Sequence, residues 1–208
     1  LRSSKMKVSG TPAMIALALL VVAVPALAQS GPAFDCAKAE HEIEELICKD
    51  AELSAKDRKM ADVFKQAIAV MEKVDAGGPE AIMELKATQR GWIGGRNECW
   101  KESDKRQCTI DSYDRRTAFL QARYFLVEGS DAVHFDCSDN SQIVATFIPT
   151  EPPSVRLERG DSLEIGILSP AASGSRYDAD FGVYFWTKND EAQVAWPQQN
   201  EFTCKVRK

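Results

Sequence analysis

The sequence predicts an α+β protein of two successive domains, a disulfide-bonded helical bundle followed by a small antiparallel β-barrel or sandwich. Three observations predict this fold class. Apolar residues recur at helical spacing as far as about Val127 and alternate every second residue from Val133 onward. The polar run Glu128-Gly129-Ser130-Asp131 lies between the two patterns and has the composition of a linker. All six cysteines lie beyond residue 28, which is typical of an exported, disulfide-bonded protein.

The first element, residues 1–28, has the pattern of a cleavable export signal. Three basic residues precede an apolar run from Ala13 to Ala23, and Ala26-Leu27-Ala28 supplies the small residues that signal peptidase requires. We therefore expect the mature chain to begin at Gln29, in the periplasm. The run is shorter than the roughly 20 apolar residues of a membrane span. The residue directly after the cleavage point is Gln29 and not a cysteine, so no lipid anchor is expected. No membrane span is expected in the mature protein.

The charge of the mature chain restricts its partners. Arg2, Lys5 and Lys7 are the only charged residues of the signal, which leaves 23 Lys and Arg against 31 Asp and Glu, a net charge of about −8. Such a surface disfavours nucleic acid and anionic lipid and suits a basic protein partner.

The even number of cysteines favours disulfides over a metal site. The cysteines are Cys36, Cys48, Cys99, Cys108, Cys137 and Cys204. Zinc is disfavoured because the chain has only two histidines, His41 and His134, and no Cys-x-x-Cys pair, so we expect neither metal nor cofactor. In the helical part, Cys36 with Cys48 and Cys99 with Cys108 is the preferred pairing because each joins nearby positions at a helix boundary. Four cysteines allow three pairings, and the other two remain open.

Residues 29–128 carry the helical pattern. Acidic residues Glu42, Glu44 and Glu45 suit the positive end of a first helix, and His41 beside them is interpreted as a surface residue. Ser54 is expected to cap the second helix, whose buried face comprises Met60, Phe64, Ala67, Ile68 and Met71. Gly77-Gly78-Pro79 ends it, and a third helix is predicted from Pro79 to about Trp100. A fourth is predicted from about Cys108 to Val127, with one stripe made of Ile110, Tyr113, Thr117, Leu120 and Tyr124.

Residues 133–208, after a linker at 129–132, carry the strand pattern. Apolar residues alternate in four segments: Val133, Phe135 and Cys137; Val155 and Leu157; Leu163, Ile165 and Ile167; Phe202, Cys204 and Val206. Turn signals fall at Asp139-Asn140, Pro152-Pro153, Gly160-Asp161 and Asn189-Asp190. Cys137 and Cys204 both fall on the apolar parity of their strands. A bond between them would close nearly the whole domain, which the chain-entropy model values at roughly 4 kcal/mol.

Candidate catalytic groups are few. Asp178 and Asp180 are conceivable as paired carboxylates of a glycoside hydrolase, but exposed acids in a turn are usually only solvated. Tyr184, Phe185 and Trp186 have the chemistry to stack on sugar, although aromatic residues in a strand more often pack. Paired cysteines are not available as nucleophiles. The sequence therefore predicts no enzyme.

The stretch "SGSRY" (173–177) followed by "FWTKNDEA" (185–192), with a cysteine near each end of the domain, resembles the MliC/PliC family of bacterial inhibitors of c-type lysozyme. The resemblance covers about residues 133–208. It implies an eight-stranded antiparallel barrel, a disulfide between the terminal cysteines, and insertion of the serine loop into the lysozyme cleft. By motif match the inhibitory pair is Ser173 and Lys188, with Gly174, Arg176 and Tyr177 in the same lysozyme-binding loop.

Two departures from that family pattern bear on the site. Asn189 stands where the family usually has glycine, and asparagine is the non-glycine residue that best tolerates a left-handed turn position. The connection from Tyr177 to Phe185 is one residue longer than usual, which leads us to expect a changed reach of Ser173 relative to Lys188. Tyr177 and neighbouring aromatic residues are expected to fill the sugar-binding subsites.

The helical part resembles the LprI-like N-terminal domain, on the stretches "FDCAKAEHEIEELICKDAELSAKDRKM", "LKATQRGWIGGRNECW" and "CTIDSYDRRTAFL". The resemblance covers about residues 34–127. Its motif residues Trp92, Arg96 and Tyr113 are interpreted as structural, with Trp92 a buried anchor. The sequence as a whole predicts a periplasmic inhibitor of c-type lysozyme. A non-catalytic envelope protein that binds glycan or another protein is the alternative, and a glycoside hydrolase is a third possibility.

Overall fold

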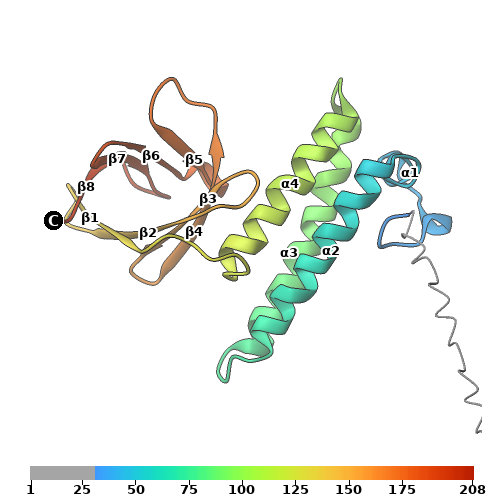
Figure 1. Ribbon diagram of the computed structural model, residues 1–208, viewed down its shortest axis with the longest axis horizontal. Helices are drawn as coiled ribbons and strands as arrows, with labels where there is room; N and C mark the ends of the chain where they lie inside the picture. The colour runs from blue at the N-terminus through green and yellow to red at the C-terminus, as the bar shows by residue number, and fades with distance from the viewer. Residues whose placement is uncertain (1–30) are drawn as a thin grey trace, which may run out of the picture.

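The computed structural model describes residues 31–208, so the predicted export signal and the start of the mature chain lie outside the described residues. In this part of the chain no helix combines the length and the apolar character that a membrane crossing needs. The helical half contains η1 (Cys36–Lys38), α1 (Glu42–Lys49), α2 (Ala51–Met71), α3 (Gly78–Asn97), η2 (Glu98–Lys101) and α4 (Lys105–Arg123). Figure 1 shows this half beside a barrel.

The helix starts show which residues act as caps. The three acids lie in the first turn of α1, as predicted, and His41 is its N-cap, accepting from the amide of Ile43 through Nδ1. The prediction that Ser54 caps α2 is wrong. Asp50 does so, because its extended backbone directly follows α1 and its carboxylate accepts from the amides of Glu52 and Leu53. Ser54 lies inside α2 and donates to the carbonyl of Ile47.

The last two helices differ from their predicted bounds. Gly77 has a left-handed φ of 81° and separates α2 from α3, as predicted. α4 begins three residues earlier than predicted because Asp104 caps it, accepting from the amide of Gln107. It ends at Arg123, before Phe125 takes a left-handed φ of 47°. The preferred pairing of the helical cysteines is confirmed: Cys36–Cys48 and Cys99–Cys108.

The C-terminal half is a closed antiparallel barrel in which each strand pairs with the next and β1 pairs with β8. Its strands are β1 (Val133–Cys137), β2 (Gln142–Ile148), β3 (Ser154–Arg159), β4 (Ser162–Ser169), β5 (Ser175–Asp178), β6 (Tyr184–Lys188), β7 (Glu191–Ala195) and β8 (Phe202–Val206), with a short η3 (Asp180–Gly182) between β5 and β6. The implied barrel of eight strands is confirmed. The alternative of a sandwich is therefore wrong.

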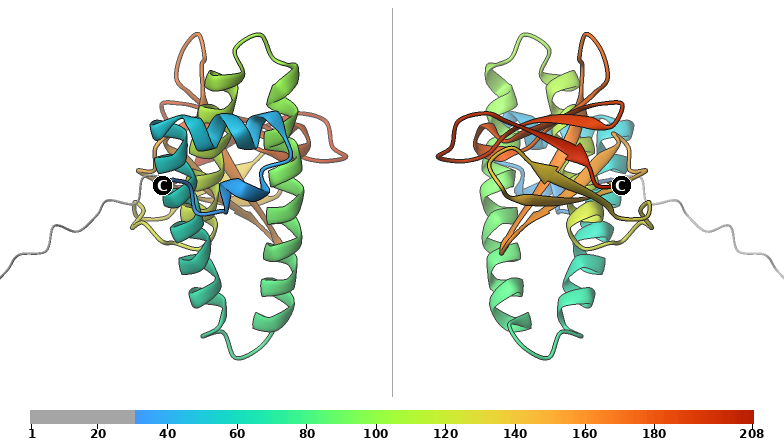
Figure 2. Two further views of the ribbon diagram at one scale, coloured as in Figure 1. Left: turned by 90° about the vertical axis from the view of Figure 1, so that its right-hand side faces the viewer. Right: turned by 90° about the vertical axis from the view of Figure 1, so that its left-hand side faces the viewer.

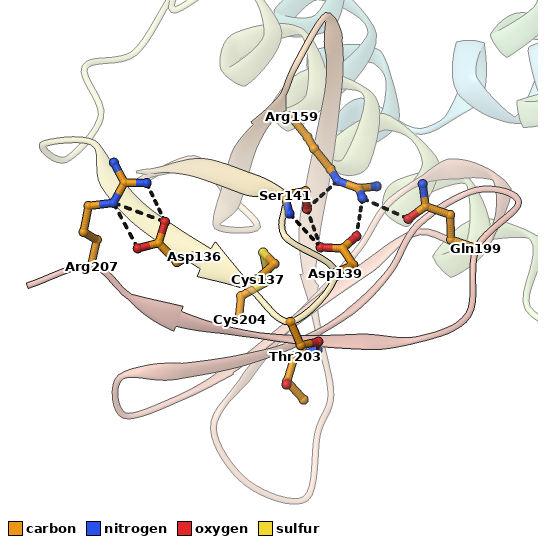
Figure 3. The surroundings of a disulfide bond; sticks show 10 residues. Asp136, Cys137, Asp139, Ser141, Arg159, Gln199, Thr203, Cys204 and Arg207 are labelled. Carbon is orange, nitrogen blue, oxygen red and sulfur yellow. Dashed lines mark hydrogen bonds and ion pairs between the residues drawn. A yellow bond between two sulfur atoms is a disulfide. The ribbon is translucent and has the colours of Figure 1, made fainter.

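A disulfide, ion pairs and hydrogen bonds hold the barrel closed. Cys137 stands opposite Cys204 in the β1–β8 register and is bonded to it, as the resemblance implied. Beside this bond, Arg207 binds the carboxylate of Asp136 at 3.1 and 3.2 Å through Nε (Figure 3). Arg159 binds Asp139, Ser141 and Gln199 on the other side of the disulfide. The two terminal strands are thus held together at several points.

The alternation along the strands predicted which residues of the β half are buried. It did not show whether they are buried inside the barrel or against a helix. Val155, Leu157, Phe135 and Phe202 point into the barrel core as expected. Leu163, Ile165 and Ile167 do not. They face outward from β4 and pack against Ala118, Ala122 and Phe119 of α4, together with Ile148.

This outward stripe explains how the two halves meet. α4 is the helix that makes the main contacts with β3 and β4 (Figure 1). The α2–α3 hairpin extends past the barrel, as both views in Figure 2 show. The helical half therefore covers one outer face of the barrel.

Candidate functional site

Ser173 and Lys188 lie together at one end of the β5–β6 hairpin. The two strands pair in regular register, with Ser175 opposite Thr187, so the residues just before β5 and at the end of β6 become neighbours. Ser173 and Lys188 line one shallow hollow of about 320 Å³, with Trp186, Asn189, Glu191 and Gln193 as the other lining residues. The hydroxyl and the ammonium predicted as a pair are therefore displayed side by side.

The serine loop has a fixed shape. Gly174 adopts a φ of +69°, and a Cβ there would lie 2.2 Å from the carbonyl oxygen of Thr187, so only glycine fits. The indole N–H of Trp186 donates to the carbonyl of Ser173 at 2.7 Å. Backbone contact and indole together hold Ser173 against β6.

The ammonium of Lys188 forms no ion pair within the described part of the chain. Its register partner across the hairpin is Glu191, but that carboxylate binds Nζ of Lys205 at 2.9 Å. The hydrogen bond from Lys205 lowers the pKa of Glu191, which keeps this ion pair charged at neutral pH. Within residues 31–208 the Lys188 ammonium has no carboxylate partner. Asn189 takes a left-handed φ of 54°, so the turn accepts asparagine in place of glycine, as expected.

The remaining loop residues are placed differently from the prediction. Arg176 pairs with Asp178 at 2.8 Å, and its guanidinium lies 4.2 Å from the centre of the Tyr184 ring. Tyr177 is only 8% exposed and packs beside Phe147 in the barrel core, so its ring does not face a partner. The aromatic residue in the hollow is Trp186, which shares the outer face of β6 with Lys188. Strand parity, which separates Trp186 from the inward Phe185, was the signal that could have found it.

Two family models match the chain, one in the helical half and one in the barrel. Residues 135–202 match the family described as "Membrane-bound lysozyme-inhibitor of c-type lysozyme", MliC, and residues 36–124 match "Lysozyme inhibitor LprI". The helical half is thus an LprI-like domain and the barrel an MliC-like domain.

Several proteins resemble this chain in sequence over most of their own length. "Lipoprotein LprI" of Mycobacterium bovis and of Mycobacterium tuberculosis is in each case 23% identical over 180 residues, which covers 85% of this chain and 85% of the relative. "Uncharacterized protein R02472" of Rhizobium meliloti is 30% identical over 110 residues, which covers 50% of this chain and 73% of that protein. No solved structure matches the chain.

The connection that we expected to be longer than usual lies far from the hollow along the hairpin. The connection from Ala179 to Val183 joins β5 to β6 at the end opposite Ser173 and Lys188. There Phe181 takes a φ of 57° and is 93% exposed, while Tyr177 still pairs with Phe185 in regular register. The position of Ser173 relative to Lys188 is set by the regular β5–β6 ladder, and the connection from Ala179 to Val183 lies outside that ladder. That a longer connection changes the reach of Ser173 stays a prediction.

The acids of the MliC region do not resemble a hydrolytic pair. Burial opposes ionisation of Asp178, but hydrogen bonds from Ser169 and Arg176 outweigh it and lower the pKa of this carboxyl. A general acid needs the opposite, a raised pKa. Asp180 is exposed in the loop after β5. Among residues 31–208, no three His, Cys, Asp or Glu side chains gather as metal ligands would.

The motif residues of the LprI region form an internal network. The Tyr113 hydroxyl donates to Asp57 at 2.8 Å and accepts from Arg96 at 2.9 Å. Burial raises the pKa of Tyr113, so its hydroxyl stays protonated. These contacts support the structural interpretation of Arg96 and Tyr113. Trp92 packs edge-on against Tyr113 but is only partly buried, so it is not the fully buried anchor that was expected.

Proposed function

We propose that this protein inhibits c-type lysozyme in the periplasm by placing Ser173 and Lys188 in the cleft of the enzyme. The observation that carries the proposal is the shared hollow, in which an exposed hydroxyl adjoins an ammonium that has no carboxylate partner within residues 31–208. The matches of its two halves to families described as lysozyme inhibitors support it.

The chemistry of the target suits this pair. A lysozyme works with two carboxyl groups, one protonated and one ionised. The Lys188 ammonium pairs with the ionised oxygen, and the Ser173 hydroxyl hydrogen-bonds to the neighbouring carboxyl. Trp186, on the same face as Lys188, offers a ring to the adjoining sugar subsite.

The scaffold supports fast and specific binding. Ser173 is held against β6 before binding, so little conformational entropy is lost when the complex forms. The net negative charge speeds encounter with a basic lysozyme and makes the association rate sensitive to salt. On this proposal the protein acts by occlusion and is not an enzyme.

A lysis assay with three lysozyme types tests the proposal. The oxidised protein is added to cell-wall suspensions with c-type, g-type or i-type lysozyme, and turbidity is followed. We expect it to slow lysis by the c-type enzyme alone. A protein that affects no lysozyme fits the alternative of an envelope binding or scaffolding protein, and one that clears cells unaided is a hydrolase.

A further inference from the structure

A groove runs between the two halves, on the side of the barrel that faces α3 and α4. It consists of two adjoining hollows of about 220 and 540 Å³. Both hollows are lined by Trp92, Arg116, Phe119, Ile165 and Asp180. The groove lies at the end of the β5–β6 hairpin opposite Ser173 and Lys188, so it is separate from the inhibitory hollow.

Arg116 of α4 is a buried cation with an unused donor in this groove. The residue is 8% exposed, and its Nε donates to Oε1 of Gln89 at 3.0 Å. Its Nη2 is buried and has no hydrogen-bond partner. Burial lowers the pKa of Arg116 to about 10, so it remains charged at neutral pH. A buried charged donor without a partner is costly, and a bound anion would supply the missing partner.

The opposite wall offers acceptors and an aromatic face. Asp180, on the loop after β5, lines both hollows but forms no ion pair with Arg116 in the described chain. Glu164 of β4 lies in the larger hollow, where burial and then the charge of Asp180 raise its pKa. Two carboxyl groups that repel one another are well placed to accept from hydroxyl donors. The partly buried ring of Trp92 adjoins both hollows.

We propose that this groove binds a sugar acid. Its carboxylate accepts from the guanidinium of Arg116, its hydroxyl groups donate to Asp180 and Glu164, and the face of its ring packs on Trp92. A purely apolar ligand would leave Arg116 without a partner, and a simple anion would leave the two carboxyl groups without donors. The mixed lining thus selects a ligand that is both anionic and hydroxylated.

A matched pair of sugars tests the proposal on the unaltered protein. N-acetylmuramic acid carries a carboxylate that N-acetylglucosamine lacks. Each is titrated into the ¹⁵N-labelled oxidised protein while the indole N–H signals of the four tryptophans are followed. We expect N-acetylmuramic acid to shift the Trp92 signal with saturation in the millimolar range and N-acetylglucosamine to bind roughly tenfold more weakly or not at all. N-acetylalanine, an acid without sugar hydroxyls, should also bind more weakly.

Two arginine variants test the residue. Arg116→Gln should abolish the saturable Trp92 shift, whereas Arg90→Gln, an exposed arginine next to Gln89 on α3, should leave it unchanged. Inhibition of c-type lysozyme serves as the folding control and should persist in both variants, because Arg116 lies outside the inhibitory hollow. Equal binding of the two sugars, tighter binding of N-acetylalanine, or no saturable shift with the folded parent would overturn the proposal.

Discussion

Lys188 and Ser173 differ in what a partner loses when each side chain is removed. Lys188→Ala leaves a carboxylate of the lysozyme buried without its cation, which typically costs about 2 to 5 kcal/mol of binding free energy. Ser173→Ala removes one hydroxyl and should cost on the order of 1 to 3 kcal/mol. Both residues are exposed, so neither change should lower the melting temperature appreciably. Titration calorimetry against a c-type lysozyme measures both effects, with Lys208→Ala as the control. A folded double variant that binds as tightly as the parent would refute this site.

Gly174 permits a second test that leaves every proposed contact group in place. In Gly174→Ala the new methyl group meets the carbonyl of Thr187, so the serine loop must move away from β6. Positive φ alone costs about 1 to 2 kcal/mol for a non-glycine residue. Gly160→Ala is the matched control, because its φ is +56° but the space around it is open. We expect a larger loss in melting temperature for Gly174→Ala, and a fall in lysozyme affinity for Gly174→Ala alone. Equal affinities of the two variants would show that loop shape does not matter.

The family motif predicted the loop of Ser173 and Gly174 and the position of Lys188, but not the packing around them. The sequence could not show that Tyr177 turns inward, because the serine loop and the core strand overlap in the same five residues. It placed Trp186 among packing aromatics, whereas its outer-face position puts it in the hollow. Side-chain parity near a loop becomes visible only when the register of the hairpin is known.

Strand β8 sets the charge of the site through Lys205, which lies opposite Glu191 of β7. This lysine holds Glu191, the cross-strand neighbour of Lys188. Lys205→Ala frees Glu191 to pair with Lys188, so lysozyme affinity should fall several-fold, more at low salt than at high salt. The double variant Lys205→Ala/Glu191→Gln removes the competing carboxylate and should regain the parent affinity. Surface plasmon resonance at two salt concentrations measures this. An unchanged affinity in Lys205→Ala would mean that Glu191 does not compete for Lys188.

The elements themselves were largely predictable from periodicity, caps and turn signals. Strand β4 shows that periodicity does not reveal which partner buries a strand. Its stripe of Leu163, Ile165 and Ile167 correctly indicated burial, but the covering partner is α4 and not the barrel interior. A period of two reports that one face of a strand is buried and carries no information on which partner buries it.

The two halves pack through apolar side chains but are not joined by a disulfide. Each of the three bonds lies within one half. A fragment of residues 132–208 keeps the whole hollow of Ser173 and Lys188 and, on the proposed function, should retain most of the c-type inhibition. It also exposes Ile148, Ile165 and Ile167, each worth about 1.5 to 3 kcal/mol when fully buried. We therefore expect it to fold when oxidised but to melt well below the parent.

Thermal melting and lysis assays on the two fragments measure this outcome. Changing Ile165 and Ile167 to Thr in the barrel fragment should improve its solubility without altering inhibition, because both face α4 and not the hollow. A folded but inactive barrel fragment beside an inhibitory fragment of residues 29–128 would place the function in the helical half. The docking itself was not predictable, because it depends on small residues of α4, Ala118 and Ala122, that carry no distinctive signal in the sequence.

The bond between Cys137 and Cys204 spans 67 positions and turns the barrel sequence into a covalent ring. The loop from Pro170 to Gly174 is exposed, which makes it a natural point of attack for proteases. A single cut there opens the ring into a linear chain but releases no fragment, because both pieces remain tethered through the sulfur atoms and through the ladders on either side. Nicked molecules should therefore persist as two-chain barrels that keep the rest of their surface after the first cleavage.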